Sequence, residues 1–339
     1  MSGVADTMDA WQVVRLGPPG QALERREVAV PQPGAGEVLV RVSACALSFP
    51  DVLLASGGYQ VQPALPFTPG IELCGTVVAT GADVDPGRLG ERVVGAPSLP
   101  HGALAEYAVA PAHTVFAAPP ELDDAAAAAL YIAYQTGWFG LHRRARLAAG
   151  ETLLVHAAAG GVGSAAVQLG TAAGARVVAV VGGAAKAEVA TGLGADVVVD
   201  RTAHEGVAGL AAALRAACGR GGADVVYDPV GGDAFAASTK VVAFEGRIVV
   251  VGFTSGTAAQ AATNHALVKN YGVLGLHWGR YQDLAPELVA QAQAEIAGLV
   301  TAGAVRPLVS ERVGPADVPD ALERLAAGRT TGRVVVVRE

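Results

Sequence analysis

Two patterns of hydrophobic positions follow one another along the chain. In the first third, short apolar runs such as 10–15, 38–42 and 75–80 are separated by turns rich in proline and glycine, including 31–34 and 85–87. Short runs between such turns are typical of strands in a compact β-rich domain. We therefore expect a barrel-like first domain whose loops could hold a ligand.

The pattern changes near Asp123, where two aspartates followed by five alanines predict a helix with an acidic N-cap. From residue 151 onward, runs of strand length alternate with helical segments, 162–173 and 186–193 being the first two helices. The predicted strands are 152–157, 176–181, 197–200, 224–228, 246–251 and 273–276. Continuous valine runs indicate strands buried on both faces, so the series predicts a doubly wound parallel sheet.

After this series the sequence predicts two helices, near 285–302 and 315–327, and a final strand at 333–337. We expect this C-terminal part to return to the first domain. The predicted fold is therefore α/β and has two domains. A β-rich domain covers 8–125 and is completed by 279–339, and a nucleotide-binding Rossmann domain covers 126–278.

The strongest single motif is Val-His-Ala-Ala-Ala-Gly-Gly-Val-Gly at 155–163, between a predicted strand and a predicted helix. Gly160 lets a backbone approach a pyrophosphate and Gly163 lets the helix lie close to the strand, while Ala158 replaces the usual first glycine. Free N–H groups at the helix start would bind the anion together with the helix dipole. A glycine-rich turn in an alanine-rich chain is the alternative, but the order of strand, helix and strand favours a dinucleotide.

The end of the second strand bears on the choice of cofactor. An NAD site places Asp or Glu there to bind the ribose hydroxyls, whereas 181–186 reads Val-Gly-Gly-Ala-Ala-Lys and the next strand ends in Asp200 and Arg201. Lys186 and Arg201 could both face a 2′-phosphate, which would favour NADPH. A charge pair at ~4 Å is worth roughly 4 kcal/mol at an intermediate dielectric. Plain surface charges are the alternative, and Asp200 is an unfavourable neighbour for a phosphate.

Further motifs extend over nearly the whole chain. They are Leu-Ser-Phe-Pro-Asp at 47–51, Gly-Gly-Tyr at 57–59, Pro-Phe-Thr-Pro-Gly-Ile-Glu at 66–72, Gly-Ala-Leu-Ala-Glu-Tyr at 102–107, Tyr-Gln-Thr at 134–136 and Tyr-Asp-Pro-Val-Gly-Gly at 227–232. In combination with the glycine-rich loop they resemble the medium-chain dehydrogenase/reductase superfamily, and within it the zinc-independent NADPH:quinone oxidoreductase (zeta-crystallin-like) branch. The resemblance implies a GroES-like catalytic domain, a Rossmann domain and an NADPH-dependent oxidoreductase.

The resemblance also implies roles for individual residues. Thr136 should lie beside the nicotinamide, Gly161 and Val162 beside the pyrophosphate, and Lys186 and Arg201 beside the adenosine phosphate. The other implied cofactor contacts are Ser48, Phe253, Thr254, His277, Trp278 and Arg329. Two positions depart from the pattern, since the branch usually has Asn in place of Ser48 and often has Tyr in place of Arg201. The match of Arg329 is loose, because its spacing to Gly332 is one residue short.

Zinc-dependent relatives bind catalytic zinc with Cys, His and a further Cys or Asp. The matching positions here are Ser48, Ile71 and, approximately, Ile132, none of which is a competent ligand. Cys45 and Cys74 lie near two of these positions, and two thiols without a third ligand are more often buried small hydrophobes. We therefore predict no metal site.

Without a Lewis acid, the hydride acceptor must already be activated, as quinones and α,β-unsaturated carbonyls are. Hydrogen-bond donors would stabilise the negative charge that develops on its oxygen. Ser48 and Tyr59 are the candidate catalytic donors, and Tyr59 could relay a proton. A loop aromatic packed at the edge of the domain is the alternative for Tyr59.

Composition narrows the class of partner. Charged residues make up 16% of the chain and the net charge is −7, and without a basic cluster in the sequence a nucleic-acid partner is not expected. No apolar run approaches the ~18 residues that a membrane span needs. Three widely separated cysteines do not suggest a disulfide framework and agree with a cytoplasmic location. The strand 273–276, at a sheet edge, is expected to pair with its copy in a homodimer.

These observations predict a zinc-independent enzyme that transfers a hydride from NADPH to a small quinone or a similar conjugated carbonyl. Two alternatives remain open. One is reduction of an enone or enoyl thioester, and the other is binding of NADPH without catalysis, since a fold alone does not guarantee an activity.

Overall fold

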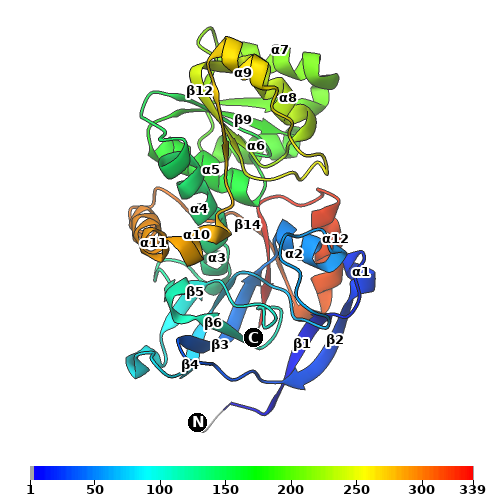
Figure 1. The fold of residues 1–339 in the computed structure, drawn as a ribbon, viewed down its shortest axis with the longest axis vertical. Coiled ribbons are helices and arrows are strands. Elements are labelled where there is room, and N and C mark those ends of the chain that lie inside the picture. Colours follow the sequence, from blue (N-terminus) through cyan, green and yellow to red (C-terminus); the bar gives the residue numbers. More distant parts are fainter. Residues whose placement is uncertain (1–3, 339) are drawn as a thin grey trace. The chain divides into compact units, whose positions relative to one another are not determined.

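A computed structural model describes residues 4–338 of the chain, and Figure 1 shows its fold. The chain forms two compact units: one runs from the N-terminal part to Ile132 and resumes at Arg306, and the other is Ala133–Val305. The first unit is rich in strands, and the second is a parallel sheet with helices. The predicted α/β class, with a β-rich domain and a doubly wound domain, is confirmed.

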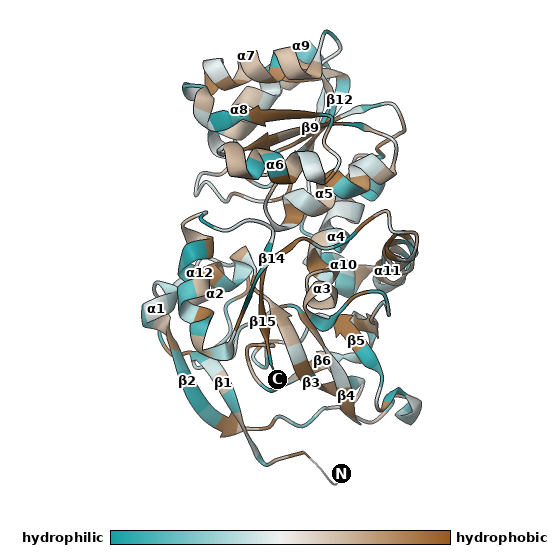
Figure 2. Ribbon diagram, turned by 180° about the vertical axis from the view of Figure 1, so that it is seen from behind, coloured by the Kyte–Doolittle hydropathy of each residue, from teal (hydrophilic) through white to brown (hydrophobic). Residues whose placement is uncertain are grey.

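The second unit is built around a parallel sheet with the strand order β10-β9-β8-β11-β12-β13. The strands are β8 (Thr152–Val155), β9 (Arg176–Val181), β10 (Val197–Asp200), β11 (Ala223–Asp228), β12 (Val242–Val250) and β13 (Gly272–Gly275). Valines occupy both faces of the central strands: Val177, Val178 and Val180 are at most 1% exposed. Figure 2 shows these strands as hydrophobic ribbons with helices around them. Helices on both faces therefore account for the uninterrupted valine runs.

Five helices connect these strands: α5 (Gly161–Ala172), α6 (Ala184–Gly192), α7 (Gly206–Cys218), α8 (Gly232–Val241) and α9 (Thr263–Lys269). The chain order reverses between the neighbouring strands β8 and β11. In sheets of this kind, ligands bind outside the carboxyl ends of the strands at such a reversal. The glycine-rich segment that follows β8 therefore stands at the preferred place for a ligand.

The first unit contains a second sheet with the strand order β14-β15-β3-β4-β5-β7, to which β6 is added beside β3. Its strands are β3 (Glu37–Ala46), β4 (Leu73–Thr80), β5 (Arg92–Gly95), β6 (Tyr107–Pro111), β7 (Val115–Ala117), β14 (Val309–Val313) and β15 (Arg333–Val337). The strands β1 (Thr7–Val13) and β2 (Leu23–Ala29) form a separate antiparallel pair. Strand β15 runs antiparallel to β3 with Val336 opposite Cys45, so the last strand of the chain lies inside the N-terminal unit.

The helices of the first unit are α1 (Pro19–Ala22), α2 (Phe49–Ser56), α3 (Asp124–Ala128) and α12 (Val318–Ala326), with short 3-10 turns at Pro86–Arg88, Ala112–Thr114 and Pro315–Asp317. Helix α4 (Tyr131–Trp138) continues as a π-helix at Phe139–Arg144, and another 3-10 turn, Arg201–Ala203, follows β10. The acidic N-cap predicted at Asp123 is present, because its carboxylate accepts the N–H of Ala126 at 2.9 Å.

Residues 279–305 differ from the predicted domain division. We expected them to join the first domain, but α10 (Gly279–Leu284) and α11 (Pro286–Thr301) belong to the second unit. Gln135 Nε2 donates to the Val289 carbonyl at 3.0 Å, and Trp138 Nε1 donates to Glu295 Oε2 at 2.7 Å. These bonds hold α11 against α4. The sequence predicted a helix near 285–302 but not the helix against which it packs.

Within residues 4–338, no helix combines the length and the apolar character needed to cross a bilayer. The three cysteines Cys45, Cys74 and Cys218 are free thiols with buried side chains. Burial raises the pKa of Cys74 to about 12 and that of Cys218 to about 11, which keeps both thiols protonated and unreactive.

Candidate functional site

The turn between β8 and α5 is shaped for close approach of a backbone. Gly160 is the N-cap of α5, and Gly161, Val162 and Gly163 form its first turn. A Cβ atom at Gly163 would lie 2.1 Å from the carbonyl oxygen of Ala157, so only glycine lets the helix begin this close to the end of the strand. Ala157 itself has a φ of 50°, in the left-handed region. The N–H groups of the first helical turn have no acceptor within the helix, which suits an anion.

Lys186 and Arg201 are brought together although they lie on different elements. Lys186 lies in the first turn of α6, and Arg201 follows β10 directly. A Cβ atom at Gly182 would lie 3.5 Å from the guanidinium nitrogens of Arg201, so this side chain crosses the turn that leads to α6. Burial and then the charge of Arg201 lower the pKa of Lys186. Two cations this close repel one another, and an anion bound between them would relieve the repulsion.

Asp200, expected to disfavour a phosphate, is part of the turn itself. Its Oδ1 atom accepts the N–H groups of Gly183 and Thr202, both at 2.9 Å, and the hydroxyl of Thr202 at 2.7 Å. The bond from Gly183 is the largest cause of its lowered pKa. The carboxylate therefore organises the turn that carries Lys186 and Arg201.

Other predicted residues of this unit follow the carboxyl ends of the last two strands. Phe253 and Thr254 come after β12, and His277 and Trp278 come after β13. The N–H of Thr254 donates to the carbonyl of Pro229 at 3.1 Å, which joins the loop after β12 to the end of β11. Phe253 is 44% exposed and Trp278 is buried, so Phe253 is the one of these two rings that can meet a ligand without rearrangement.

Thr136, the remaining predicted residue of the second unit, lies on α4 and is 7% exposed. Its side chain is therefore buried and comes from a helix, not from a loop. Its predicted contact with a nicotinamide stays a prediction.

In the first unit, Ser48 belongs to a buried charge network that sequence reasoning missed. Its N–H donates to Asp51 Oδ2 at 2.8 Å as α2 begins. Arg333 Nη2 donates to Ser48 Oγ at 2.8 Å and forms an ion pair with Glu72. The other oxygen of Glu72 accepts the N–H of Ile132 at 2.7 Å. The four polar side chains are at most 5% exposed, so each depends on the others for partners.

The arginine of this network is Arg333, four residues after the predicted Arg329. Arg329 is exposed just after α12, and its predicted contact with a cofactor phosphate stays a prediction. Arg333 begins β15, and this strand pairs with β3, which ends next to Ser48. The sequence did contain one signal that could have identified Arg333. Four valines follow it in the strand, and a charged side chain in a buried strand needs a partner.

Burial shifts the two acids of the network in the same direction. It raises the pKa of Asp51 to about 6, although the N–H groups of Ser48 and Gly70 favour the carboxylate. It raises the pKa of Glu72 to about 7, although Arg333 favours the charged form there. Desolvation is the larger effect for both acids, so each carboxylate is less favoured in this interior than it would be in water.

Tyr59, the second predicted catalytic residue, follows α2 and its left-handed C-cap Gly57. Its ring packs against the hydrophobic core of the first unit. Burial raises the pKa of its hydroxyl, so the phenol stays protonated at neutral pH and can act as a donor. Packing and a donor role are compatible for this side chain.

The positions that match zinc ligands carry no suitable donor set. Ile71 and Ile132 are hydrocarbons, and the hydroxyl of Ser48 is engaged with Arg333. Cys45 and Cys74 lie on the paired strands β3 and β4. Between residues 4 and 338, no group of three or more His, Cys, Asp or Glu side chains is arranged to hold a metal.

Two family models match the chain, one in each unit. The model for the alcohol dehydrogenase GroES-like domain matches residues 34–120, and the model for zinc-binding dehydrogenase matches residues 161–294. The GroES-like character expected of the β-rich domain is thereby confirmed.

Individual relatives match along nearly the whole length. Quinone oxidoreductase-like protein 2 of Mus musculus is 35% identical over 317 residues, which is 93% of this chain and 89% of the mouse protein. Among solved structures, mycobacterial Rv1454c complexed with NADPH is 32% identical, with a TM-score of 0.90 over 98% of this chain and 100% of that one. A quinone oxidoreductase of Pseudomonas syringae pv. Tomato DC3000 is 30% identical, with a TM-score of 0.88 over the same shares.

The raised pKa values of Asp51 and Glu72 predict a specific dependence of stability on pH. Between about pH 4 and pH 7 Asp51 and Glu72 hold more protons in the folded chain than in the unfolded chain, so their contribution to the free energy of unfolding falls as pH rises. The stability from the two protonated acids is present below about pH 4 and is lost as pH passes through about 6 and then 7. Urea unfolding at several pH values should show that Asp51→Asn removes on the order of 1–3 kcal/mol of this decline.

The control is Asp320→Asn, which changes an exposed carboxylate of the same unit. It keeps Asp51 and Glu72 in place, so the decline of stability that these two acids cause should remain. An identical slope for Asp51→Asn and the unaltered chain would contradict the assignment of Asp51.

Proposed function

Because this chain belongs to the medium-chain dehydrogenase/reductase superfamily, in its quinone oxidoreductase branch, we propose that it reduces a quinone or a similar conjugated carbonyl with NADPH. The observation that carries the proposal is the glycine-rich start of α5 together with the cation pair of the second unit. The N–H groups at Gly161 and Val162 would hold the pyrophosphate, and Lys186 with Arg201 would hold the 2′-phosphate. NADPH supplies a hydride when it is bound.

The first unit would supply the hydrogen-bond donors. Arg333 donates to Ser48 Oγ, so the serine's own hydrogen remains to be donated to a carbonyl oxygen of the acceptor. A cation that binds a hydroxyl oxygen polarises its O–H bond and makes it a stronger donor. Tyr59, whose pKa is raised, would be a second donor.

A panel of acceptors tests the reaction. Purified chain, NADPH and a benzoquinone or naphthoquinone should consume NADPH, measured by loss of the nicotinamide absorbance, and should yield the hydroquinone. Reduction of enones to saturated carbonyls without turnover of any quinone would support the enone alternative instead. Saturable NADPH binding without turnover across the panel would support a non-catalytic role.

Substitutions of the two proposed donors test their roles in the same assay. Ser48→Ala should lower kcat by about tenfold to a hundredfold, because a donor to the developing oxyanion is lost. Tyr59→Phe should lower kcat by a smaller factor. Tyr107→Phe, on β6, is the matched control and should leave kcat unchanged. Full activity of Ser48→Ala would remove Ser48 from the reaction.

The cation pair should determine the choice between NADPH and NADH. Lys186→Ala and Arg201→Ala should each raise the Kd of NADPH by about tenfold and change the Kd of NADH by less than about twofold. Fluorescence titration of both nicotinamide cofactors measures this difference. Arg143→Ala, which removes an exposed arginine elsewhere in the unit, should change neither Kd. Equal losses for both cofactors would contradict a phosphate contact.

We also propose a homodimer formed through β13. This strand is the last in the sheet order, and Val273 on it is 36% exposed. An apolar edge strand tends to pair with another chain. Light scattering at micromolar concentration should give twice the chain mass of 33.9 kDa, and Val273→Lys should reduce it toward that of a single chain. A single-chain mass without substitution would contradict the proposal.

A further inference from the structure

A groove of about 510 Å³ crosses the second unit at the amino ends of its strands. It is lined by the end of α7 and the loop that follows, the end of α8, the start of β12 and one residue of α9. Residues at the beginning of β12 form part of its wall, whereas the glycine-rich loop follows the carboxyl end of β8. In a parallel sheet these are opposite edges, so the groove is separate from the proposed cofactor site.

Four cations line this groove: Arg215, Arg220, Lys240 and Lys269. Two of the chain's three lysines are therefore here, in a chain whose net charge is −7. Among residues 4–338, none of the four cations forms an ion pair with a carboxylate. The sequence showed no basic cluster because these residues come from three helices and a loop, and only the fold assembles them.

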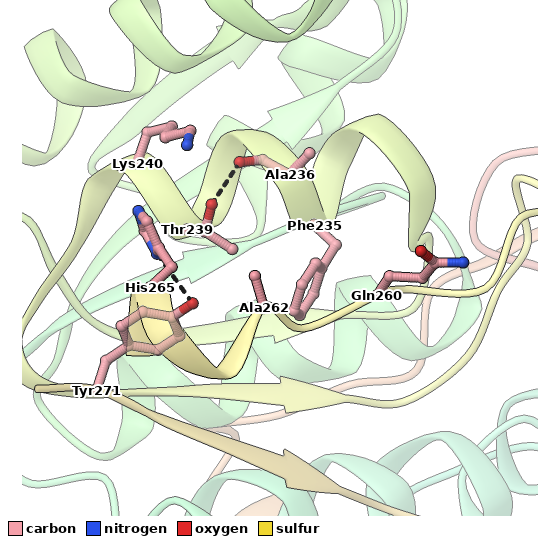
Figure 3. Close-up of a pocket in the computed structure, with 8 residues that line it drawn as sticks. All are labelled: Phe235, Ala236, Thr239, Lys240, Gln260, Ala262, His265 and Tyr271. Atoms are coloured by element: carbon pink, nitrogen blue, oxygen red, sulfur yellow. Dashed lines mark hydrogen bonds between the residues drawn. The ribbon is translucent and has the colours of Figure 1, made fainter. Parts of the chain in front are cut away.

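The cations are close enough to affect one another. The pKa of Lys269 is lowered by burial and then by the charges of Arg215 and Lys240. Lys240 also lines a neighbouring cavity of about 170 Å³, shown in Figure 3. There the pKa of His265 is lowered by desolvation and then by Lys240 and Lys269. Positive charge without a carboxylate ion pair thus lines both hollows in the described part of the chain.

The carboxyl end of α8 accounts for part of this charge. Arg215 Nη2 donates to the carbonyl of Lys240 at 3.2 Å, and Lys269 Nζ donates to that of Thr239 at 3.0 Å. A helix end carries only about half an elementary negative charge. The side chains of Arg220 and Lys240 make no hydrogen bond within the described part of the chain, so capping of α8 does not explain them.

The remaining walls of the groove leave room for a ligand. Arg220 stands between Gly219 and Gly221, where an added Cβ atom would meet nothing within 4 Å, so the loop backbone is open. Phe244 also lines the groove and is 71% exposed. The volume lies within the range of about 300–1,000 Å³ that is typical of small-molecule sites.

We propose that this groove binds an anion with two or more phosphate groups, independently of the cofactor site. Guanidinium groups bind phosphate oxygens in pairs and ammonium groups bind them as point charges. Four cations within one groove match a ligand of several negative charges better than a single carboxylate. The phosphate chain could be a free oligophosphate or part of a nucleotide, whose base would stack on Phe244.

Lysine footprinting tests the site directly, because the chain has only three lysines. The full chain is acetylated with an activated ester, with and without inorganic tripolyphosphate, and each lysine is quantified by mass spectrometry. Tripolyphosphate should slow acetylation of Lys240 and Lys269 at least about fivefold and leave Lys186 unchanged at subsaturating concentration. Absence of protection, or equal protection of all three lysines, would overturn the proposal, and so would equal protection of Lys240 by NADPH.

Calorimetry with variants supplies the second measurement. Lys240→Gln and Arg220→Gln should each weaken tripolyphosphate binding at least about fivefold, while the exposed control Arg143→Gln should change it less than about twofold. Neither groove variant removes a hydrogen bond of the fold, so a loss of affinity without a change in Tm marks a ligand contact. Equal weakening by all three variants would show nonspecific attraction and overturn the site.

A comparison of two probes identifies the source of the phosphates. ATP that binds more tightly than tripolyphosphate, with the advantage lost in Phe244→Ala, would assign a nucleotide to the groove. Equal affinity of both probes would assign a free oligophosphate. NADPH consumption in the acceptor assay should be unchanged in Lys240→Gln, so failure of this proposal is distinguishable from failure of the proposed reductase.

Discussion

Burial of a parallel sheet on both faces is the constraint on which the second unit depends. Helices cover the valine-rich faces of β8 to β12, so polar chemistry is confined to the two edges where the strands begin and end. At the carboxyl edge, Gly163 allows α5 to start against the end of β8, and Lys186 and Arg201 meet beyond β9 and β10. At the amino edge, the ends of α7, α8 and α9 bring four cations together. One architecture therefore gathers cations at two separate edges, and we propose that each edge binds an anion.

The first unit differs from the second because it places charged side chains inside a β-rich core. Arg333 and Glu72 are almost fully buried, and an isolated charge there would be strongly unfavourable. Ser48 and the N–H of Ile132 give the pair further hydrogen bonds, whereas Arg333 Nε is buried without a partner among the described residues. The same arrangement places the hydroxyl of Ser48, which accepts a hydrogen bond from Arg333, at the start of α2.

Local sequence patterns predicted the local structure well. The predicted bounds of β9 and β10 agree with the structure, and so does the N-cap at Asp123. The valine runs and the glycine-rich loop determine such elements within a few residues, without help from distant parts of the chain. The predicted cation pair also lies on adjacent elements of one βαβ series, so its proximity follows from topology.

What the sequence did not reveal depends on contacts between distant segments. The sequence predicted α11 as a helix but not its neighbour. That neighbour is α4, whose Gln135 and Trp138 donate hydrogen bonds to α11. Arg333 meets Ser48 only because β15 pairs with β3. The basic groove is likewise invisible to a scan for charge runs, since its residues are brought together from three helices and a loop.

The position of β15 has a consequence for synthesis of the chain on the ribosome. The second unit is a continuous segment, Ala133–Val305, and can acquire its contacts while later residues are still being added. The sheet of the first unit lacks a strand next to β3, and Glu72 lacks its cation, until residues near the very end have emerged. The first unit is thus completed only after the second unit has been translated, and until then it has an open strand edge and an acid without its cation.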